Sequence, residues 1–297
     1  MTPEPRTIPP APWQCVLIAW GQAYPVSEIN LLAQTIRDLA QGLQRIVLIT
    51  DRDRPGLLPD IVTTAFPDFF LQPRFIRGSC LAKLAMFEKG VIPDDLPTVY
   101  CDLDTLVLKD LSPLPKLLRR ADTIAMLPAS IISFGGFSRA VHYLTNGRVH
   151  ARGNSSLVVF NPLACHHIAR GFRTLYAAKD GQPFRPFGAD DRFLSWVAQN
   201  VLRAVPNSMC VKLPAEYMQF WPWLIRLRAN LPWIRRRRDA LMAVTLPGLR
   251  VKGRDLLSLQ DGQIITDRRG RKLIWSDSAL GALRGKLIAH YSQLDAP

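Results

Sequence analysis

Short apolar runs alternate with helix-like stretches along the first two thirds of the sequence. The runs lie at residues 15–20, 45–50, 98–101, 123–127 and 157–160, and each is rich in aliphatic residues without polar alternation. Strands that are covered on both faces have this composition, whereas a strand with one solvent-facing side alternates apolar and polar residues. The pattern therefore predicts five buried strands.

Stretches with helical periodicity connect these runs. Ser27 is predicted as an N-cap before apolar residues that recur every three or four positions, and similar stretches cover residues 79–90 and begin at Asp190. Alternating strands and helices are typical of an α/β fold with a mainly parallel sheet. In such sheets ligands bind beyond the carboxyl ends of the strands, so polar residues that follow the apolar runs are the first candidates for a site.

The composition is that of a globular protein with a large core. The chain has 297 residues, of which 48% are hydrophobic and 21% charged, and its five cysteines are scattered without a metal-binding spacing. No apolar run approaches the ~20 residues that span a bilayer. Residues 1–12 are rich in proline and lack the apolar core of a signal peptide, which predicts a flexible leader and a cytoplasmic protein.

A formal net charge of +14 indicates an anionic partner. Residues 221–238, Trp221 to Arg238, hold three tryptophans, six arginines and no acidic residue, which favours peripheral contact with the anionic inner face of a membrane. A packed helix pair with a solvated basic face is the alternative, and nucleic acid is not expected because no recognisable binding module accompanies the charge. We predict a catalytic core over residues 13–214 and a basic, aromatic C-terminal subdomain over residues 215–297.

The segment TVYCDLDTLVLKDL, residues 98–111, places Asp102 and Asp104 directly after a predicted strand. Residues two apart on an extended chain project to the same side, so the two carboxylates repel each other unless a cation lies between them. Carboxylate oxygens suit Mg²⁺ or Mn²⁺, and a site with only two carboxylates leaves coordination positions for substrate phosphates. A metal site is one interpretation, and a solvated turn is the simpler one.

A phosphatase of the haloacid-dehalogenase type is another interpretation, with Asp102 as the nucleophile. Its Asp-x-Asp-x-Thr/Val pattern requires a hydroxyl residue or valine where Leu106 stands, and it normally follows the first strand of the fold. Two predicted strands precede Asp102, which counts against this interpretation. A further alternative is a non-enzymatic membrane- or nucleic-acid-binding protein in which Asp102 and Asp104 have no chemical role.

A series of short motifs resembles the GT-A glycosyltransferases, in particular family 8 and related uncharacterised bacterial transferases. The series is WGQAYPVSEINLLAQTIRDL, ITDRDRPGLLPDI, RGSCLAKLAMFEKG, TVYCDLDTLVLKDLSPL, NSSLVVFNP, GADDRFLSW and LIAHYSQ, and it spans most of the sequence. Each motif is short, and the resemblance depends on their order. It implies an α/β fold of the GT-A type, with a Rossmann-like mixed, mainly parallel sheet flanked by helices.

The resemblance implies a metal-dependent glycosyltransferase that moves a sugar from a nucleotide-sugar, with a UDP-sugar as the expected donor, to a glycan or lipid-linked acceptor. Asp102 and Asp104 match the motif that holds Mn²⁺ or Mg²⁺ against the diphosphate, and His290 matches a histidine that completes the metal shell. Asp190 and Asp191 match acids that act as general base or bind sugar. The remaining matches imply a donor-binding set: Trp20, Gly21, Tyr24, Asp51, Lys83, Asn154 and Ser155.

Some of these assignments compete with structural roles. An acid pair at the start of a helix is favoured by the helix dipole alone, and a lone histidine after an apolar triplet is commonly structural. The closing pattern of family 8, His-x-x-Gly-x-x-Lys-Pro-Trp, does not follow His290, whose sequel is YSQLDAP. Since the lysine of that pattern contacts the diphosphate in the family, another cation is expected to take its place here: Arg77, Lys83 or Lys286.

Overall fold

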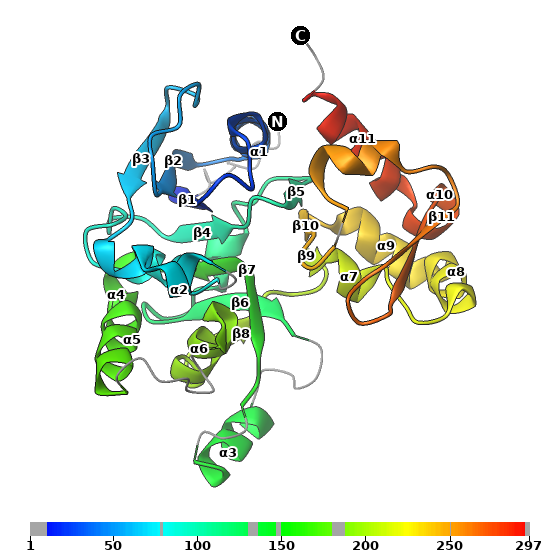
Figure 1. The fold of residues 1–297 in the computed structure, drawn as a ribbon. Helices are drawn as coiled ribbons and strands as arrows, with labels where there is room; N and C mark the ends of the chain where they lie inside the picture. Colours follow the sequence, from blue (N-terminus) through cyan, green and yellow to red (C-terminus); the bar gives the residue numbers. More distant parts are fainter. Residues whose placement is uncertain are drawn as a thin grey trace, which may run out of the picture.

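The protein consists of two parts that lie side by side: a large sheet with helices on the left of Figure 1, and a group of short strands and helices on the right. The computed structural model describes residues 11–77, 80–129, 136–146, 150–179, 188–249 and 251–294. Most of the predicted leader, residues 1–12, lies outside the described residues.

The large sheet has seven strands in the order β3-β2-β1-β4-β7-β6-β8. Four of its six neighbouring strand pairs are parallel, and the two pairs that involve β7 are antiparallel. The sheet is therefore mixed and mainly parallel, which confirms the predicted fold class. Its strands are β1 (Trp13–Ala19), β2 (Leu43–Thr50), β3 (Ile61–Ala65), β4 (Thr98–Cys101), β6 (Ile124–Pro128), β7 (Gly153–Phe160) and β8 (Leu202–Ala204).

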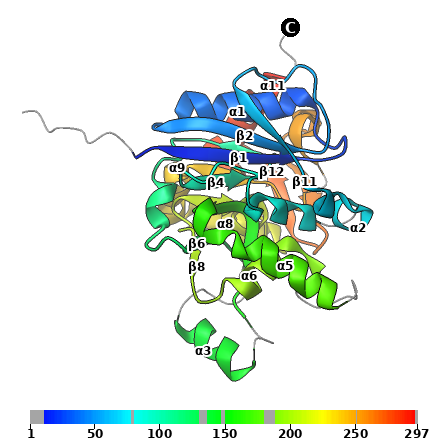
Figure 2. The same ribbon diagram turned by 90° about the vertical axis from the view of Figure 1, so that its left-hand side faces the viewer.

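Helices cover both faces of this sheet, which explains why its strands lack polar alternation. In β1, Cys15 and Leu17 share one hydrophobic cluster with α1, whereas Val16 and Ile18 share another with α2, α5 and α6. Figure 2 shows α1 above the strands and α5 and α6 below them. The helices are α1 (Val26–Leu39), α2 (Pro73–Ile76), α4 (Pro162–Cys165), α5 (His167–Ala178) and α6 (Asp190–Val197), with α3 (Gly136–Leu144) at the periphery.

The five predicted strands are present in the large sheet, and two further strands of this sheet, β3 and β8, escaped prediction. β3 lies at the edge of the sheet and exposes three of its five residues, so it lacks the apolar signature of its neighbours. The helix predicted over residues 79–90 is a 3-10 helix over Leu81–Phe87, in which all seven residues are buried. Further 3-10 helices cover Asp68–Leu71, Leu114–Leu117 and Gly253–Ser258.

A three-stranded sheet joins the two parts of the molecule. After Asp104 the chain leaves the large sheet as β5 (Thr105–Val107), which pairs antiparallel with β10 (Ala243–Thr245). β10 also pairs parallel with β9 (Cys210–Lys212). Residues from the last quarter of the sequence are therefore held directly beside Asp102 and Asp104.

Short helices and one hairpin complete the right-hand part of Figure 1. The hairpin consists of β11 (Gln263–Thr266) and β12 (Lys272–Trp275), and Trp275 packs in a hydrophobic cluster with Tyr217 and Leu287. In the described ranges, none of the helices has the length and hydrophobicity required to cross a bilayer. The helices of this part are α7 (Leu213–Glu216), α8 (Pro222–Asn230), α9 (Pro232–Ala240), α10 (Asp277–Leu280) and α11 (Ala282–Ser292).

Candidate functional site

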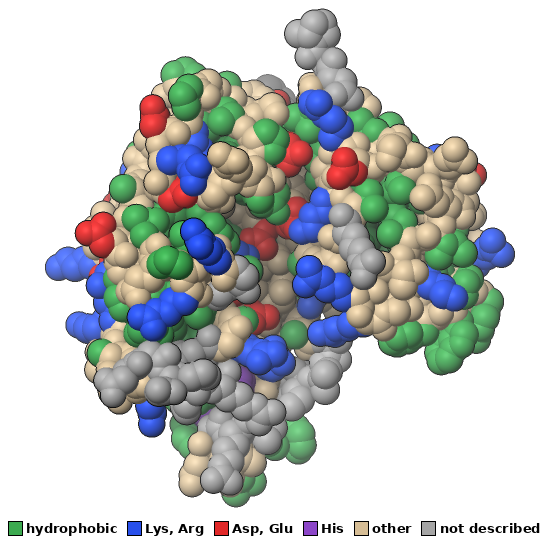
Figure 3. Space-filling model, in the orientation of Figure 1, with side chains coloured by type: hydrophobic (Ala, Val, Ile, Leu, Met, Phe, Trp, Pro, Cys, Tyr) green, Lys and Arg blue, Asp and Glu red, His purple; other side chains and the backbone are tan. Residues whose placement is uncertain are grey.

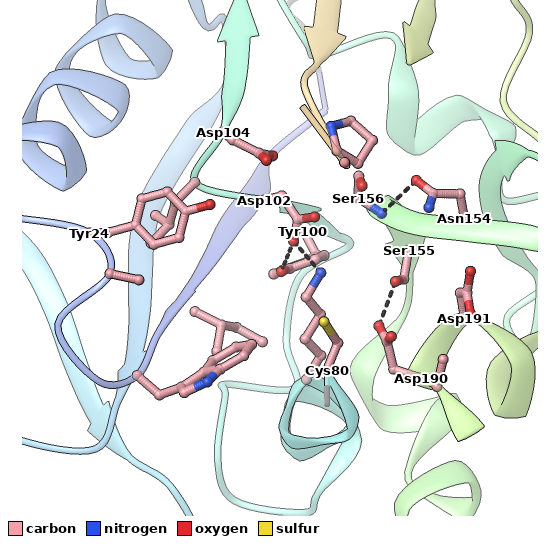
Figure 4. A pocket seen from close by; sticks show the side chains of 18 of the residues that line it. Tyr24, Cys80, Tyr100, Asp102, Asp104, Asn154, Ser155, Ser156, Asp190 and Asp191 are labelled. Atoms are coloured by element: carbon pink, nitrogen blue, oxygen red, sulfur yellow. Dashed lines mark hydrogen bonds and ion pairs between the residues drawn. The ribbon is translucent and has the colours of Figure 1, made fainter. Parts of the chain in front are cut away.

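A cavity of about 460 Å³ opens beyond the carboxyl ends of β1 and β4. The beginning of β7 and the first turn of α6 form its opposite wall, because β7 runs antiparallel to β4. Complete ligand sites commonly have volumes of about 300–1,000 Å³. Nine of the twelve predicted site residues line this cavity (Figure 4): Trp20, Tyr24, Lys83, Asp102, Asp104, Asn154, Ser155, Asp190 and Asp191.

Asp102 is held at the end of β4 by two donors. Lys83 Nζ lies 2.5 Å from Asp102 Oδ1, and the Tyr100 hydroxyl donates to the same oxygen. Burial of Lys83 favours its neutral amine, but the carboxylates of Asp102 and Asp190 outweigh this effect and raise its pKa well above the usual value. Lys83 is therefore a buried, charged cation at the cavity wall and not a solvated lysine.

Asp104 is buried and carries a carboxylate that is only half satisfied. The Lys252 ammonium pairs with Asp104 Oδ2, while Oδ1 is buried without a hydrogen-bond partner in the described chain. Burial and the neighbouring Asp102 raise the pKa of Asp104, and Lys252 opposes the rise. Burial of a carboxylate oxygen without a hydrogen-bond partner costs free energy, so Asp104 Oδ1 is available to coordinate a cation.

Lys252 was missed by the sequence analysis, although a signal for it exists. The segment TLPGLRVK, residues 245–252, has the form Thr-x-x-Gly-x-x-x-Lys. This form differs from the closing pattern of family 8 by threonine in place of histidine, by one extra residue before the lysine, and by Gly253-Arg254 where the pattern has Pro-Trp. Gly248 and Lys252 both line the cavity, whereas Arg77 and Lys286 do not.

The charges that line the cavity leave room for a divalent cation. Four carboxylates, those of Asp102, Asp104, Asp190 and Asp191, face two ammonium groups, so the lining has a net charge of −2 when all six groups are ionised. Hard oxygen donors and the free Asp104 Oδ1 suit Mg²⁺ or Mn²⁺, which are bound by one or two carboxylates together with substrate phosphates. The described residues do not include a group of three or more His, Cys, Asp or Glu side chains that could hold a metal ion. The lining therefore fits a cation that shares its coordination with a ligand.

Asp190 and Asp191 lie across the cavity from Asp102 and Asp104 in Figure 4. Asp190 is buried and accepts a hydrogen bond of 2.5 Å from the Ser155 hydroxyl. Burial raises its pKa to about 6. Asp191 is only half-buried, and its carboxylate has no hydrogen-bond or ion-pair partner among the described residues. The two acids therefore differ: Asp190 is fixed in the wall, and Asp191 is free to meet a ligand.

Asn154 presents a donor to the same cavity. Its side-chain oxygen accepts a hydrogen bond from the Ser156 backbone N–H at 3.2 Å, and Figure 4 shows this contact. The amide NH₂ group is left to donate to a ligand. The strand start at Asn154 and Ser155 therefore offers hydrogen-bonding groups of the kind that sugar hydroxyls require.

Gly21 and Asp51 do not line the cavity but hold the turn that precedes α1. The Gly21 N–H donates to Asp51 Oδ2 at 3.1 Å, and the Arg54 guanidinium donates to the Gly21 carbonyl at 3.0 Å. Gly21 has φ +63°, a conformation that favours glycine. These contacts position Trp20 and Tyr24, which do face the cavity.

His290 lies in α11 and does not line the cavity. It is 7% exposed, and burial lowers its pKa to about 4, so the imidazole is neutral near pH 7. Its ring packs edge-to-face against Tyr291. The structure does not bring His290 into a ligand set with Asp102 and Asp104, and its role in metal binding stays a prediction.

Solved glycosyltransferases share this architecture. The galactosyltransferase LgtC, in complex with donor and acceptor sugar analogues, matches with a TM-score of 0.54 at 15% identity, over 96% of this chain and 97% of that chain. The chain has a GT-A glycosyltransferase fold. GlyE of Streptococcus pneumoniae TIGR4 matches with a TM-score of 0.51 at 12% identity, over 96% of this chain and 62% of that chain. The bifunctional glycosyltransferase WbbM matches with a TM-score of 0.52 at 14% identity, over 82% of this chain and 47% of that chain.

At these identities the shared property is the fold. The sequence matches no protein-family profile and no curated protein. The GT-A fold removes the basis for the phosphatase interpretation, which required its nucleophile to follow the first strand of a different fold. Asp102 instead follows β4, at the centre of the seven-stranded sheet, and its Oδ1 is occupied by Lys83 and Tyr100.

Proposed function

We propose that this protein is a metal-dependent glycosyltransferase that moves a sugar from a nucleotide-sugar to a glycan or lipid-linked acceptor. The observation that carries the proposal is the pairing of two opposed carboxylate groups in one cavity of a GT-A fold: Asp102 and Asp104 on one wall, Asp190 and Asp191 on the other. A UDP-sugar is the expected donor, and LgtC, which the fold resembles, was solved with donor and acceptor sugar analogues.

The wall near β1 and β4 would hold the nucleoside diphosphate. Trp20 and Tyr24 offer aromatic surface against which a nucleobase stacks. Lys83 and Lys252 offer two charged donors, and charge-assisted hydrogen bonds to phosphate oxygens are among the strongest that a side chain makes. Asp102 and Asp104 would hold Mn²⁺ or Mg²⁺, which when bound offsets the charge of the diphosphate.

The wall at β7 and α6 would hold the sugar and the acceptor. The Asn154 amide donates to a sugar hydroxyl, and Asp190 fixes the Ser155 hydroxyl beside it. The bond from the sugar anomeric carbon to the diphosphate oxygen breaks, and its electron pair stays on the diphosphate. The acceptor hydroxyl oxygen forms the new bond, and Asp191, the unpaired carboxylate, takes the hydroxyl proton.

Nucleotide-dependent thermal stabilisation tests the proposal. UDP, GDP and CMP are added to the protein with Mn²⁺, with Mg²⁺ and with a chelator, and release of UDP from UDP-glucose and UDP-galactose is followed in parallel. We expect stabilisation by one nucleotide that requires a divalent cation and is absent in Asp102→Asn/Asp104→Asn. A matched control, Asp38→Asn/Asp261→Asn, removes two exposed carboxylates and is expected to behave as the wild type. If no nucleotide stabilises the wild type in a metal-dependent way, the non-enzymatic alternative replaces this proposal.

We also propose that α8 and α9 attach the enzyme peripherally to the anionic, cytoplasmic face of a membrane. Trp221, Trp223 and Trp233 are 58%, 62% and 65% exposed, and hydrophobic side chains gather at the edge of the molecule where α8 lies (Figure 3). Large exposed apolar side chains in one region are unusual for a surface that meets only water. Tryptophan rings settle at the depth of lipid headgroups, beside which arginines bind anionic lipid.

Only part of the arginine run is available for lipid. Arg237 and Arg238 donate to the buried carboxylate of Glu216, so they hold α9 to α7. Arg236 is exposed, and Arg235 is exposed as well but donates to the Ala229 carbonyl at 2.8 Å and to Asn230 Oδ1 at 2.5 Å. Co-sedimentation with phosphatidylglycerol-containing vesicles is expected to fall in Trp223→Ala/Trp233→Ala and to weaken with salt. Equal sedimentation with neutral vesicles, or no loss in this variant, would exclude the membrane proposal.

A further inference from the structure

A second, smaller cavity adjoins the donor cavity on the side of β7. It has a volume of about 230 Å³ and shares Asn154, Pro247 and Gly248 with the larger cavity. The volume is below the range of complete ligand sites, about 300–1,000 Å³, so this hollow is better described as a subsite of the larger one. We name it the hairpin pocket, since the turn between β11 and β12 forms one wall. Its other lining residues are Lys212, Pro214, Ala215, Asp267, Arg268, Arg269 and Arg271.

The hairpin pocket is strongly cationic. Four basic side chains line it, those of Lys212, Arg268, Arg269 and Arg271, against the one carboxylate of Asp267. Both carboxylate oxygens of Asp267 already accept hydrogen bonds. The donors are the Arg271 guanidinium and the backbone N–H groups of Arg269 and Arg271, each at 2.9 Å. The guanidinium groups of Arg268 and Arg269 are exposed and have no partner among the described residues. The pocket therefore holds unmatched positive charge.

Lys212 makes the pocket more than a solvated basic surface. It ends β9, is half-buried, and has no hydrogen bond or ion pair within the described chain. Burial, together with nearby Arg271 and Arg269, lowers its pKa to about 8, although Asp191 opposes the change. A cation that is desolvated among other cations is unfavourable by itself, and an anionic ligand removes the penalty.

The backbone of the hairpin is fixed in place, so the Arg271 guanidinium and the segment that carries Arg268 and Arg269 are positioned before a ligand binds. The Arg271 guanidinium donates to the Pro214 carbonyl at 2.8 Å, and Gln219 and Lys272 exchange two backbone hydrogen bonds. Figure 3 shows Lys and Arg side chains along the right-hand side of the central hollow, with carboxylates deeper inside. A preorganised site loses less entropy when its ligand binds.

We infer that the hairpin pocket binds an anionic substituent, a phosphate or carboxylate, on the acceptor sugar. The inference depends on the proposed function, because it takes the larger cavity as the donor site. The donor diphosphate has its own cations, Lys83 and Lys252, on the wall of Asp102 and Asp104. The hairpin pocket lies instead beside Asn154 and within the electrostatic reach of Asp191, where the acceptor must approach the sugar.

Ligand-observed NMR titration with glucose 6-phosphate, glucose and inorganic phosphate tests the inference. Wild type is compared with Arg268→Gln/Arg269→Gln and with Arg226→Gln/Arg236→Gln, a control that removes the same charge from the exposed surface of α8 and α9. Glucose 6-phosphate is expected to bind wild type at least about tenfold more tightly than glucose, as charge-assisted hydrogen bonds provide. The hairpin variant loses this preference, and the control keeps it.

Each other outcome overturns the inference. Equal binding of glucose and glucose 6-phosphate means that the anion is not recognised, and equal losses in both variants mean that only overall charge matters. Inorganic phosphate that binds as tightly as glucose 6-phosphate means that no sugar is recognised. Displacement of glucose 6-phosphate by UDP places the anion in the donor site. The titrations without UDP are independent of the donor assay, so a protein that fails to bind UDP refutes the proposed function separately.

Discussion

Replacement of Asp190 by asparagine is expected to stabilise the free protein at neutral pH. Asp190 is 4% exposed, and its pKa is raised to about 6 by burial, with Lys83 opposing and Asp191 adding to the rise. Asparagine has nearly the same shape, and its amide oxygen can still accept the hydrogen bond from Ser155. The variant therefore removes the buried charge and leaves the packing of the wall in place.

The size of the effect follows from proton linkage. In the unfolded chain an aspartate ionises near pH 3.8, so well below that value the side chain is neutral in both states. Between about pH 4 and about pH 6 the aspartate is ionised in the unfolded chain but still protonated in the folded protein. A rise in pH through this window therefore favours the unfolded state. The difference between 3.8 and about 6 corresponds to about 3 kcal/mol of unfolding free energy, all of it lost by pH 7.

Urea unfolding in chelator, without nucleotide, measures this difference. The free energy of unfolding of Asp190→Asn minus that of wild type is expected to grow by about 2 kcal/mol between pH 4 and pH 7, because a small part of the difference is already present at pH 4. Asp38→Asn, on the exposed face of α1, is the control and is expected to follow the wild type. The reasoning about burial would be refuted if the unfolding free energies of Asp190→Asn and wild type changed in parallel with pH. It would also be refuted if the variant lost stability relative to wild type as the pH rises.

Three further predictions concern single side chains. Lys252→Ala should weaken UDP binding about tenfold and strengthen binding of Mn²⁺ alone, because it removes a phosphate donor and frees Asp104; calorimetric titration with each ligand measures both changes. Asp191→Asn should lower the turnover of UDP-sugar at least about 10²-fold with unchanged UDP affinity, and a loss of affinity instead would assign Asp191 to binding. Glu216→Ala should destabilise the protein by about 3 kcal/mol in urea unfolding, because Arg238 is left buried without its anion, and an unchanged midpoint would contradict this.

The strands of the large sheet were predictable because burial on both faces leaves a strong local signal. In β1, both the residues that face α1 and those that face α5 are apolar, so the run stands out in the sequence. β3 gave no such signal, since an edge strand keeps polar residues. The pairing of β5 with β10 joins Thr105 to Thr245, about 140 residues apart, and no local pattern encodes such a contact.

In the candidate site, the residues that follow buried strands were predictable from the sequence, and Lys252 was not. Residues that follow buried strands, such as Asp102 and Trp20, are brought to one edge of the sheet by its parallel order. Lys252 reaches the cavity through the β5–β10 pairing, and it is one of 38 lysines and arginines, so its charge alone did not distinguish it. His290 was predicted from the order of motifs, and the structure places it in α11, away from the cavity lining.

The contact between Lys252 and Asp104 would give the proposed binding of metal and of nucleotide a common cause. In the free protein the ammonium occupies Asp104 Oδ2, so a divalent cation competes with Lys252 for the same carboxylate. A diphosphate would offer the ammonium an alternative partner and would thereby leave the Asp104 carboxylate available to hold a metal. Linkage requires that UDP raises the affinity for Mn²⁺ by the same factor as Mn²⁺ raises the affinity for UDP. If this exchange operates, Lys252→Ala reduces that factor, because in the variant the carboxylate is free before the nucleotide arrives.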